Sequence, residues 1–313
     1  MSFERIKGRL VQGRPLVVAS DICASFRARG VALDSPGAIG QLIREKPYEV
    51  LEHHRMEVES KVDILTALTA DTTPRALAEV GMHHRSAQLT GRALELAMQA
   101  AAESPKPIAI AGILGSDMVS PVAADRLHEE LIEHAARISV AGAELIIARG
   151  QGSRVNLMAA VVAAARTDLP TWAVVECTPD GNSTSGAPLI ELIGALHEAG
   201  ASVVLFEVPR MDIGIRDLER FSAALENESL VAGVLLAASE TALPGFNDPE
   251  SDPERWVDRA IDLSVSGARV VGGGAGTTEA HTRELAYALG SLHPSLPATR
   301  SDTELDGKPS GDY

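Results

Sequence analysis

Short apolar runs recur at fairly steady intervals along the chain, and each is followed by a stretch in which apolar residues repeat with helical spacing. Three sets show this spacing, each set sharing one helical face: Leu127, Leu131, Ala135 and Ile138; Leu218, Phe221 and Leu225; Leu285, Ala288, Leu289 and Leu292. The apolar runs, which we interpret as strands, are 16–21, 62–71, 108–115, 144–150, 171–177, 202–209, 231–238 and 268–276. A strand and then a helix, repeated eight times, predicts an α/β fold of the (β/α)8 TIM barrel type.

A doubly wound open sheet is the competing architecture. Its glycine fingerprint, GxGxxG, would follow the first strand, where the chain instead reads VVASDICAS. We therefore predict a single barrel over residues 1–293. Residues 294–313 are polar and rich in Pro, Ser and Asp, and we expect them to form a disordered tail.

Composition and charge limit the classes of function. The 313 residues are 45% hydrophobic, as in a soluble globular protein. The formal net charge is −15, and no window is rich in Lys and Arg, so we expect no nucleic acid or membrane partner and predict small-molecule chemistry. The N-terminal residues lack the apolar core of a signal peptide, and no apolar stretch is long enough to span a bilayer, so we expect a cytoplasmic protein.

Cysteine, histidine and tryptophan residues give little sign of a metal site. The two cysteines, Cys23 and Cys177, have no CxxC spacing, and a zinc site combining them with His54 or His281 is disfavoured because buried structural cysteines are commoner. Core packing accounts for Trp172 and Trp256. The paired histidines, which we interpret as solvated, are His53, His54, His83 and His84.

Charged and hydroxyl residues gather where the predicted strands end, which in a barrel is the face that carries active sites. Any one of these acids more often caps a helix or faces solvent. Asp21 and Glu207 are the exceptions, because each ends an apolar run that should be buried, where an unpaired carboxylate is costly and a partner or ligand is expected. The strand-end residues are Asp21, Asp71, Asp117, Arg149, Glu176, Glu207, Glu240, Thr277 and Thr278.

Four segments, in order, resemble the homocysteine S-methyltransferase family, and the similarity spans roughly residues 14–293. VVASDICASFRARG resembles the family's opening DGAMGT strand, and Asp21 falls on its aspartate. Residues 46–81 resemble the family's helix with a histidine, here His54, followed by the AGADII strand and the TNTF turn. GASVVLFEV resembles the strand ending in GVNC. The most specific match is VVGGGAGTTEAH, residues 270–281, with GGCCGTTPEH. The resemblance implies the family's barrel, one-carbon or sulfur metabolism and, since its members are often oligomeric, a homo-oligomer.

The departures from the family pattern concern its chemistry. In that family three cysteines hold a zinc ion that activates the thiol of homocysteine. The corresponding positions here are Val208, Gly274 and Ala275, none of which can bind zinc, so we expect no metal and no cofactor. Arg149 falls where the family has a glutamate, which reverses the charge and favours an anionic substrate group there.

Three hypotheses for function follow. The first is a zinc-independent, methyltransferase-like enzyme acting on a small zwitterionic or onium metabolite, with methyl transfer retained as one option. The second is an enzyme for a phosphorylated metabolite that uses the glycine-rich loop 272–278. The third is a catalytically inactive binding or regulatory partner of an active enzyme. For the first, the candidate catalytic residues are Asp21, Glu176 and Glu207, and the candidate substrate-binding residues are Asp21, Arg149, Thr69, Asp71, Gly273, Gly274 and Thr277.

Overall fold

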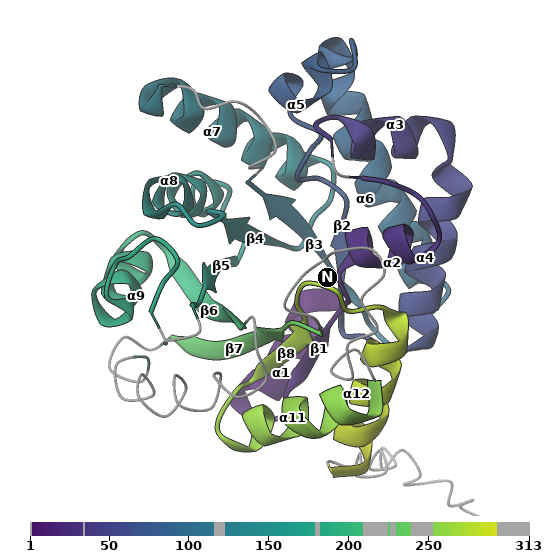
Figure 1. Ribbon diagram of the computed structural model, residues 1–313, viewed down its shortest axis with the longest axis vertical. Coiled ribbons are helices and arrows are strands. Elements are labelled where there is room, and N and C mark those ends of the chain that lie inside the picture. The colour runs from purple at the N-terminus through teal and green to yellow at the C-terminus, as the bar shows by residue number, and fades with distance from the viewer. Residues whose placement is uncertain are drawn as a thin grey trace, which may run out of the picture.

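Eight parallel strands form a closed barrel in chain order (Figure 1). The computed structural model describes residues 2–33, 35–115, 123–178, 182–208, 225, 230–238 and 253–292. Pairing of β1 with β8, in which Leu16 lies opposite Val270, closes the barrel, so the predicted (β/α)8 architecture is confirmed. The strands are β1 (Leu16–Val18), β2 (Ile64–Ala67), β3 (Ala109–Leu114), β4 (Leu145–Arg149), β5 (Thr171–Glu176), β6 (Ala201–Val208), β7 (Val231–Leu236) and β8 (Val270–Gly273).

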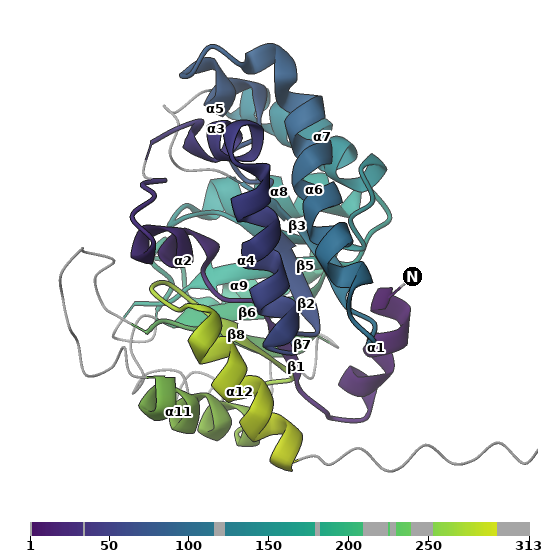
Figure 2. The same cartoon turned by 90° about the vertical axis from the view of Figure 1, so that its right-hand side faces the viewer.

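Helices surround the barrel, and α4, α6 and α12 run along its outer side in Figure 2. None of the helices in the described segments has the length and apolar character needed to cross a membrane. Their bounds are α1 (Ser2–Val11), α2 (Ile22–Ala28), α3 (Ala38–Glu45), α4 (Pro47–Glu59), α5 (Pro74–Ala78), the 3-10 turn η1 (His83–Arg85), α6 (Ser86–Ala102), α7 (Ala124–Val140), α8 (Arg154–Ala165), α9 (Leu189–Glu198), α11 (Pro253–Val265) and α12 (Glu279–Leu292).

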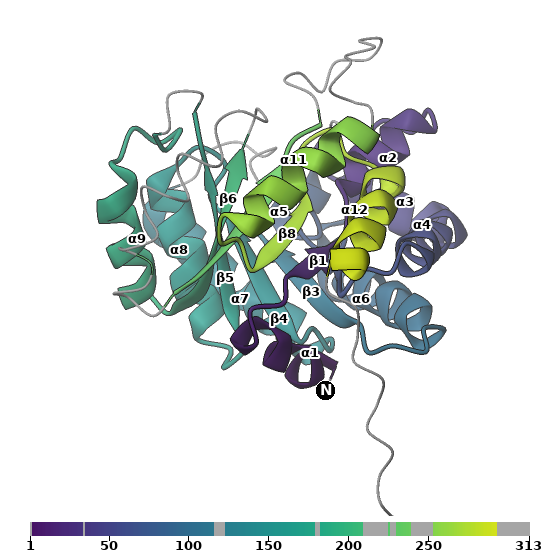
Figure 3. The same ribbon diagram turned by 90° about the horizontal axis from the view of Figure 1, so that it is seen from below.

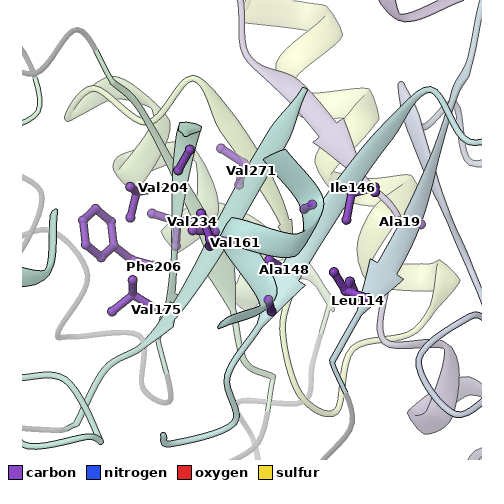
Figure 4. Close-up of a cluster of buried hydrophobic side chains, with 14 of the residues drawn as sticks. Ala19, Leu114, Ile146, Ala148, Val161, Val175, Val204, Phe206, Val234 and Val271 are labelled. Atoms are coloured by element: carbon purple, nitrogen blue, oxygen red, sulfur yellow. The ribbon is translucent and has the colours of Figure 1, made fainter. Parts of the chain in front are cut away.

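Alternate residues of each strand belong to two different cores, because successive side chains of a strand point to opposite faces. In β6, Val203 and Leu205 pack inside the barrel, whereas Val204, Phe206 and Val208 pack between the barrel and the helices. Figure 4 shows part of this outer cluster. The same alternation places the side chain of the last strand residue either in the barrel mouth or behind it.

Helix α1 covers the N-terminal end of the barrel (Figure 3). Its buried residues Phe3 and Ile6 join the cluster inside the barrel, and the Phe3 ring meets the edge of Trp172 with ring centroids 6.1 Å apart. Trp172 and Trp256 are both fully buried, which confirms their predicted core role. The barrel is thus closed at the end opposite to the predicted site.

The predicted helical faces agree with the structure where it describes them. In α7, Leu131, Ala135 and Ile138 are buried, and in α12 the same holds for Leu285 and Leu289. The predicted face with Leu218 and Phe221, the strand-end residues Asp117 and Glu240 and the tail 294–313 lie outside the described residues.

The interpretation of the paired histidines was wrong for one pair. His83 and His84 are exposed as predicted, but His53 and His54 are each only 1% exposed. His53 packs against Phe26 at 5.6 Å between ring centroids. Burial lowers the pKa of His54 to about 4 and that of His53 well below its usual value, so both rings are neutral and serve as core residues.

Candidate functional site

A pocket of about 270 Å³ opens at the C-terminal ends of the strands. Backbone and side chains from both ends of the chain line it, since β1 and β8 are neighbours. Six of the predicted site residues meet there, together with Ser20 and Gln151, which the sequence did not single out. The polar and loop residues are Ser20, Asp21, Thr69, Arg149, Gln151, Glu207, Gly273, Gly274 and Ala275.

Asp21 begins helix α2 and also anchors the glycine-rich loop. Its Oδ1 accepts the N–H of Cys23 at 3.0 Å, as an N-cap residue does, and its Oδ2 accepts the N–H of Gly276 at 3.2 Å. Burial raises the pKa of the Asp21 carboxyl, although these N–H groups and the charge of Arg149 act in the opposite direction. The carboxylate thus pays a desolvation cost that a cation in the pocket would reduce.

Arg149 and Glu207 form an ion pair in the barrel mouth. Both continue the inward-facing sides of their strands, after Ile147 and Leu205. Burial on its own would lower the pKa of the Arg149 guanidinium, but attraction to Glu207 and, more weakly, to Glu176 and Asp21 raises it instead. The positive charge of Arg149 is therefore already balanced by protein carboxylates.

Two glycines hold the Arg149 segment in place. At Gly115, which follows β3 with a φ of +120°, any Cβ would lie 2.2 Å from the carbonyl oxygen of Arg149. At Gly150 a Cβ would lie 2.4 Å from the Cβ of Leu157. Because neither position can carry a side chain without a clash, the backbone segment around Arg149 packs directly on its neighbours.

Three further predicted residues lie at the edge of this arrangement. The Thr69 hydroxyl lines the pocket but donates to the Ile113 carbonyl and accepts its N–H, both at 2.8 Å. Asp71 is buried and does not line the pocket. Glu176 lines a small adjoining cavity with Gln151 instead. The functional roles of Thr69, Asp71 and Glu176 stay predictions.

Several donors of the glycine-rich loop after β8 are bonded within the protein. Gly274 donates its N–H to the carbonyl of Leu236 at 2.8 Å, and Gly276 donates to Asp21. The Thr277 hydroxyl donates to the Gly274 carbonyl at 2.7 Å and accepts the Asp21 N–H at 3.1 Å. At Gly273 a Cβ would lie 2.1 Å from that same hydroxyl oxygen, so the loop is a close-packed turn. Thr277 is fully buried and does not line the pocket.

The three positions that the family resemblance assigns to zinc do not fit a metal here. Val208 belongs to the cluster behind the barrel wall, on the face opposite to Glu207. A Cβ at Gly274 would lie 2.9 Å from backbone atoms of β7 and the turn after it, so no cysteine fits without moving that backbone. Ala275 lines the pocket but has no donor atom. Across the described residues, no three or more His, Cys, Asp or Glu side chains are placed to share a metal ion.

Sequence reasoning missed a fully buried carboxylate behind the pocket. Glu57 of α4 accepts the N–H of Ser20 at 3.1 Å and also its hydroxyl proton. Burial, with a smaller contribution from Glu279, raises the pKa of Glu57 to about 7, although the two hydrogen bonds from Ser20 lower it. The only sequence signal was an acid on the apolar side of a helix.

Two more residues near the pocket were also missed. Gln151 has a φ of +52°, which is uncommon for a residue other than glycine and is a frequent feature of functional loops. His134 of α7 is buried and donates from Nε2 to the Thr69 carbonyl at 2.8 Å. Burial lowers the pKa of His134 to about 4, so it is neutral and positions the Thr69 turn. Neither sequence position carried a signal of these roles.

A closed barrel with charged residues at its strand C-termini places the protein in the TIM-barrel class. The family model for homocysteine S-methyltransferase matches residues 23–289, and the chain belongs to this family. No curated protein shows a significant match to the sequence.

Solved structures extend the likeness to the fold. The metallated form of the homocysteine methyltransferase MmuM from Escherichia coli is 17% identical and superposes with a TM-score of 0.76, covering 90% of this chain and 99% of that one. Dihydropteroate synthase from Stenotrophomonas maltophilia is 15% identical with a TM-score of 0.51, covering 90% and 95%. At these identities the likeness shows the barrel fold alone.

Proposed function

We propose that the chain is a zinc-independent, methyltransferase-like enzyme that binds a small zwitterionic or onium metabolite in the pocket at the strand C-termini. Membership of the family supports transfer of a methyl group, and the unsuitable positions 208, 274 and 275 support a reaction that does not use the family's zinc. One-carbon or sulfur metabolism is the corresponding setting.

The observation that carries the proposal is the charge balance around Arg149. Glu207 pairs with its guanidinium, and Glu176 and Asp21 are near enough to act on its pKa. One cation thus faces three carboxylates, which leaves the site with an excess of negative charge. A sulfonium or quaternary ammonium group would reduce this excess and the desolvation cost of Asp21, whereas an anionic group facing Arg149 would compete with Glu207.

An onium donor also makes a metal-free transfer chemically reasonable. The acceptor's electron pair attacks the methyl carbon, the carbon–sulfur or carbon–nitrogen bond breaks, and its electron pair returns to the leaving atom as a neutral thioether or tertiary amine. The acceptor's proton passes to a carboxylate, for which Glu207 and Glu176 are the candidates, while Asp21 faces the cation. Most of the remaining rate enhancement would come from holding donor and acceptor in line.

The phosphate alternative has less support. A phosphate site in the 272–278 loop needs N–H groups that point at the ligand. Those of Gly274 and Gly276 are already bonded to Leu236 and Asp21, and the Thr277 hydroxyl is bonded on both sides. A phosphate would also approach the Asp21 carboxylate. We therefore keep the onium proposal alone for this pocket.

The test is thermal stabilisation by matched ligands. Glycine betaine and a methylsulfonium amino acid should raise the melting temperature of the protein, because a ligand that binds only the folded state stabilises it. 3,3-Dimethylbutanoate, which has the shape of glycine betaine without its positive charge, should have no such effect. Equal stabilisation by 3,3-dimethylbutanoate, or none by any onium compound, would contradict the proposal.

A pair of variants locates the binding. Asp21→Asn should abolish the stabilisation by the onium ligand, while Glu198→Gln, an exposed carboxylate at the end of α9, should retain it with the same change in net charge. Activity is then measured with isotopically labelled methyl groups and chelator-treated protein, using thiol and amine acceptors. Transfer that requires added zinc would contradict the metal-independent reaction.

A further inference from the structure

A second pocket, of about 510 Å³, lies at the other end of the barrel, where β1, β2 and β3 begin. Helix α1, the turn that leads from it into β1 and the C-terminal half of α12 complete its walls. Figure 3 shows α1 crossing this end of the barrel close to β1. No residue lines both this basal pocket and the candidate active site, so the two are separate.

Five cationic side chains line the basal pocket, and they come from four separate segments of the chain. The one carboxylate in its wall, Asp63, is already engaged, because it pairs with Arg9 and accepts the Val17 N–H at 2.9 Å. Within the described residues, the other four cations make no ion pair and no side-chain hydrogen bond. The five are Arg5, Arg9, Arg14, Lys61 and Lys106.

The turn that carries Arg14 is held from both sides. Arg9 donates to the Pro15 carbonyl at 2.8 Å, and Arg269 donates to the Gly13 carbonyl at 3.1 Å. Gly13 has a φ of +72°, and the Arg14 N–H closes the end of α1 on the Arg9 carbonyl at 2.8 Å. Arg14 is half-buried on this fixed turn and faces the pocket without a partner of its own. Because this turn is already fixed, its backbone needs little further ordering when an anion binds to Arg14.

We propose that the basal pocket binds a phosphorylated small molecule. A cluster of like charges repels itself, and this chain has a net charge of −15 yet leaves these four cations unpaired in one place. Guanidinium and ammonium groups are the donors that phosphate oxygens prefer. The volume is in the range of metabolite sites, and Ile6, Pro107 and Tyr287 supply an apolar wall for the organic part of the ligand.

Titration calorimetry of the full chain with inorganic pyrophosphate at low salt tests the proposal. We expect saturable binding that is weaker for inorganic phosphate, which carries less charge, and that declines as salt screens the cations. The double variant Arg14→Gln/Lys106→Gln should weaken pyrophosphate binding by about tenfold or more, since each charge-assisted bond contributes that much. The matched control Lys46→Gln/Arg126→Gln removes two exposed cations elsewhere and should bind pyrophosphate as the natural sequence does.

Three results would overturn the proposal. The first is the absence of saturable pyrophosphate binding at low salt. The second is an equal loss of pyrophosphate affinity in both double variants, which would mean that only the net charge of the protein matters. The third is binding of vesicles of anionic lipid or of an oligonucleotide without binding of pyrophosphate, which would assign the surface to a macromolecule. The onium test of the other pocket is unaffected by any of these, because the two sites share no residue.

Discussion

Asp21, in the turn between the first strand and α2, accepts the backbone N–H of Gly276, in the loop after the last strand, at 3.2 Å. The return bond runs from the Asp21 N–H to the Thr277 hydroxyl at 3.1 Å. These two bonds join segments 255 and 256 residues apart in sequence at the mouth of the pocket. The carboxylate that we assign to the onium group is therefore also the residue that fixes the glycine-rich loop.

This double role predicts different effects for two substitutions of Asp21. Asp21→Ala removes the N-cap of α2 and the acceptor for Gly276, and should lower the free energy of unfolding by about 2 kcal/mol. Asp21→Asn keeps one side-chain oxygen as an acceptor, so its loss should be about half as large. Both variants should lose onium binding. Urea unfolding with parallel ligand titration measures the two effects, and an Asn variant that binds as well as the natural sequence would exclude a charge role.

The Arg149–Glu207 pair predicts coupled substitutions. Arg149→Met leaves a largely buried Glu207 without its cation, and the free energy of unfolding should fall by about 2–3 kcal/mol. The double variant Arg149→Met/Glu207→Gln should lose clearly less than the sum of the single variants, by about 1 kcal/mol or more. A double-mutant cycle from chemical denaturation measures the difference. Additive losses would mean that the two side chains do not interact in solution.

Glu57 predicts a pH dependence with a defined sign. Its pKa in the folded protein is about 7, above the usual 4.5, so the folded state holds the proton more tightly than the unfolded state. The resulting stabilisation is complete below about pH 4.5 and is lost as the pH rises to about 7, a change of about 3 kcal/mol from the linkage relation. Glu57→Gln, which is always neutral and can still accept from Ser20, should not lose this stabilisation.

The comparison of the variant with the natural sequence isolates this effect. The buried histidines titrate in the opposite sense between pH 4 and 6.5, but they contribute equally to both proteins. Between pH 4.5 and 8, the free energy of unfolding of Glu57→Gln should thus rise by about 3 kcal/mol relative to that of the natural sequence. Glu59→Gln, exposed on the same helix, should follow the natural sequence at every pH. Parallel curves for Glu57→Gln would show that the carboxyl is ionised in the folded state.

The barrel was predictable from sequence because its signal is local and repeated. Each strand alternates between two apolar environments and contains a continuous apolar run, as in 172–175, and a helical pattern follows. Strand ends were also predictable, since parallel strands share one active face. Asp21, Arg149 and Glu207 therefore meet in one pocket as the strand-end rule requires.

Pairing between distant residues was not predictable. Arg149 lies 58 residues from Glu207, and nothing local indicates that its charge is balanced by the protein, so the sequence favoured an anionic substrate group there. His53 and His54 follow Glu52 and precede Arg55, polar neighbours that indicated a solvated helix face. The basal cations are equally scattered along the chain. Only folding brings these groups together, because their contacts depend on long-range closure and not on sequence spacing.

The last prediction concerns the family's zinc positions. If the positions were merely missing their ligands, restoring cysteines would rebuild a metal site. Here Gly274→Cys should instead lower the free energy of unfolding by about 2–3 kcal/mol, because its Cβ would meet backbone atoms of β7 and the following turn at 2.9 Å. Ala275→Cys, exposed on the same loop, should change stability little. The matched pair separates a steric effect from the chemistry of a new thiol.

The triple variant Val208→Cys/Gly274→Cys/Ala275→Cys then tests the geometry directly. A cysteine at 208 would lie in the cluster behind the barrel wall, and a Cβ at 274 would meet backbone atoms at 2.9 Å, although positions 274 and 275 both line the pocket. The three sulfurs therefore should not be able to share one tetrahedral ion. We expect elemental mass spectrometry to find no stoichiometric zinc in the purified variant. Zinc bound at one ion per chain would show that the β7 and β8 ends can still close around a metal. In that case the natural sequence has lost only the ligands and has kept the scaffold.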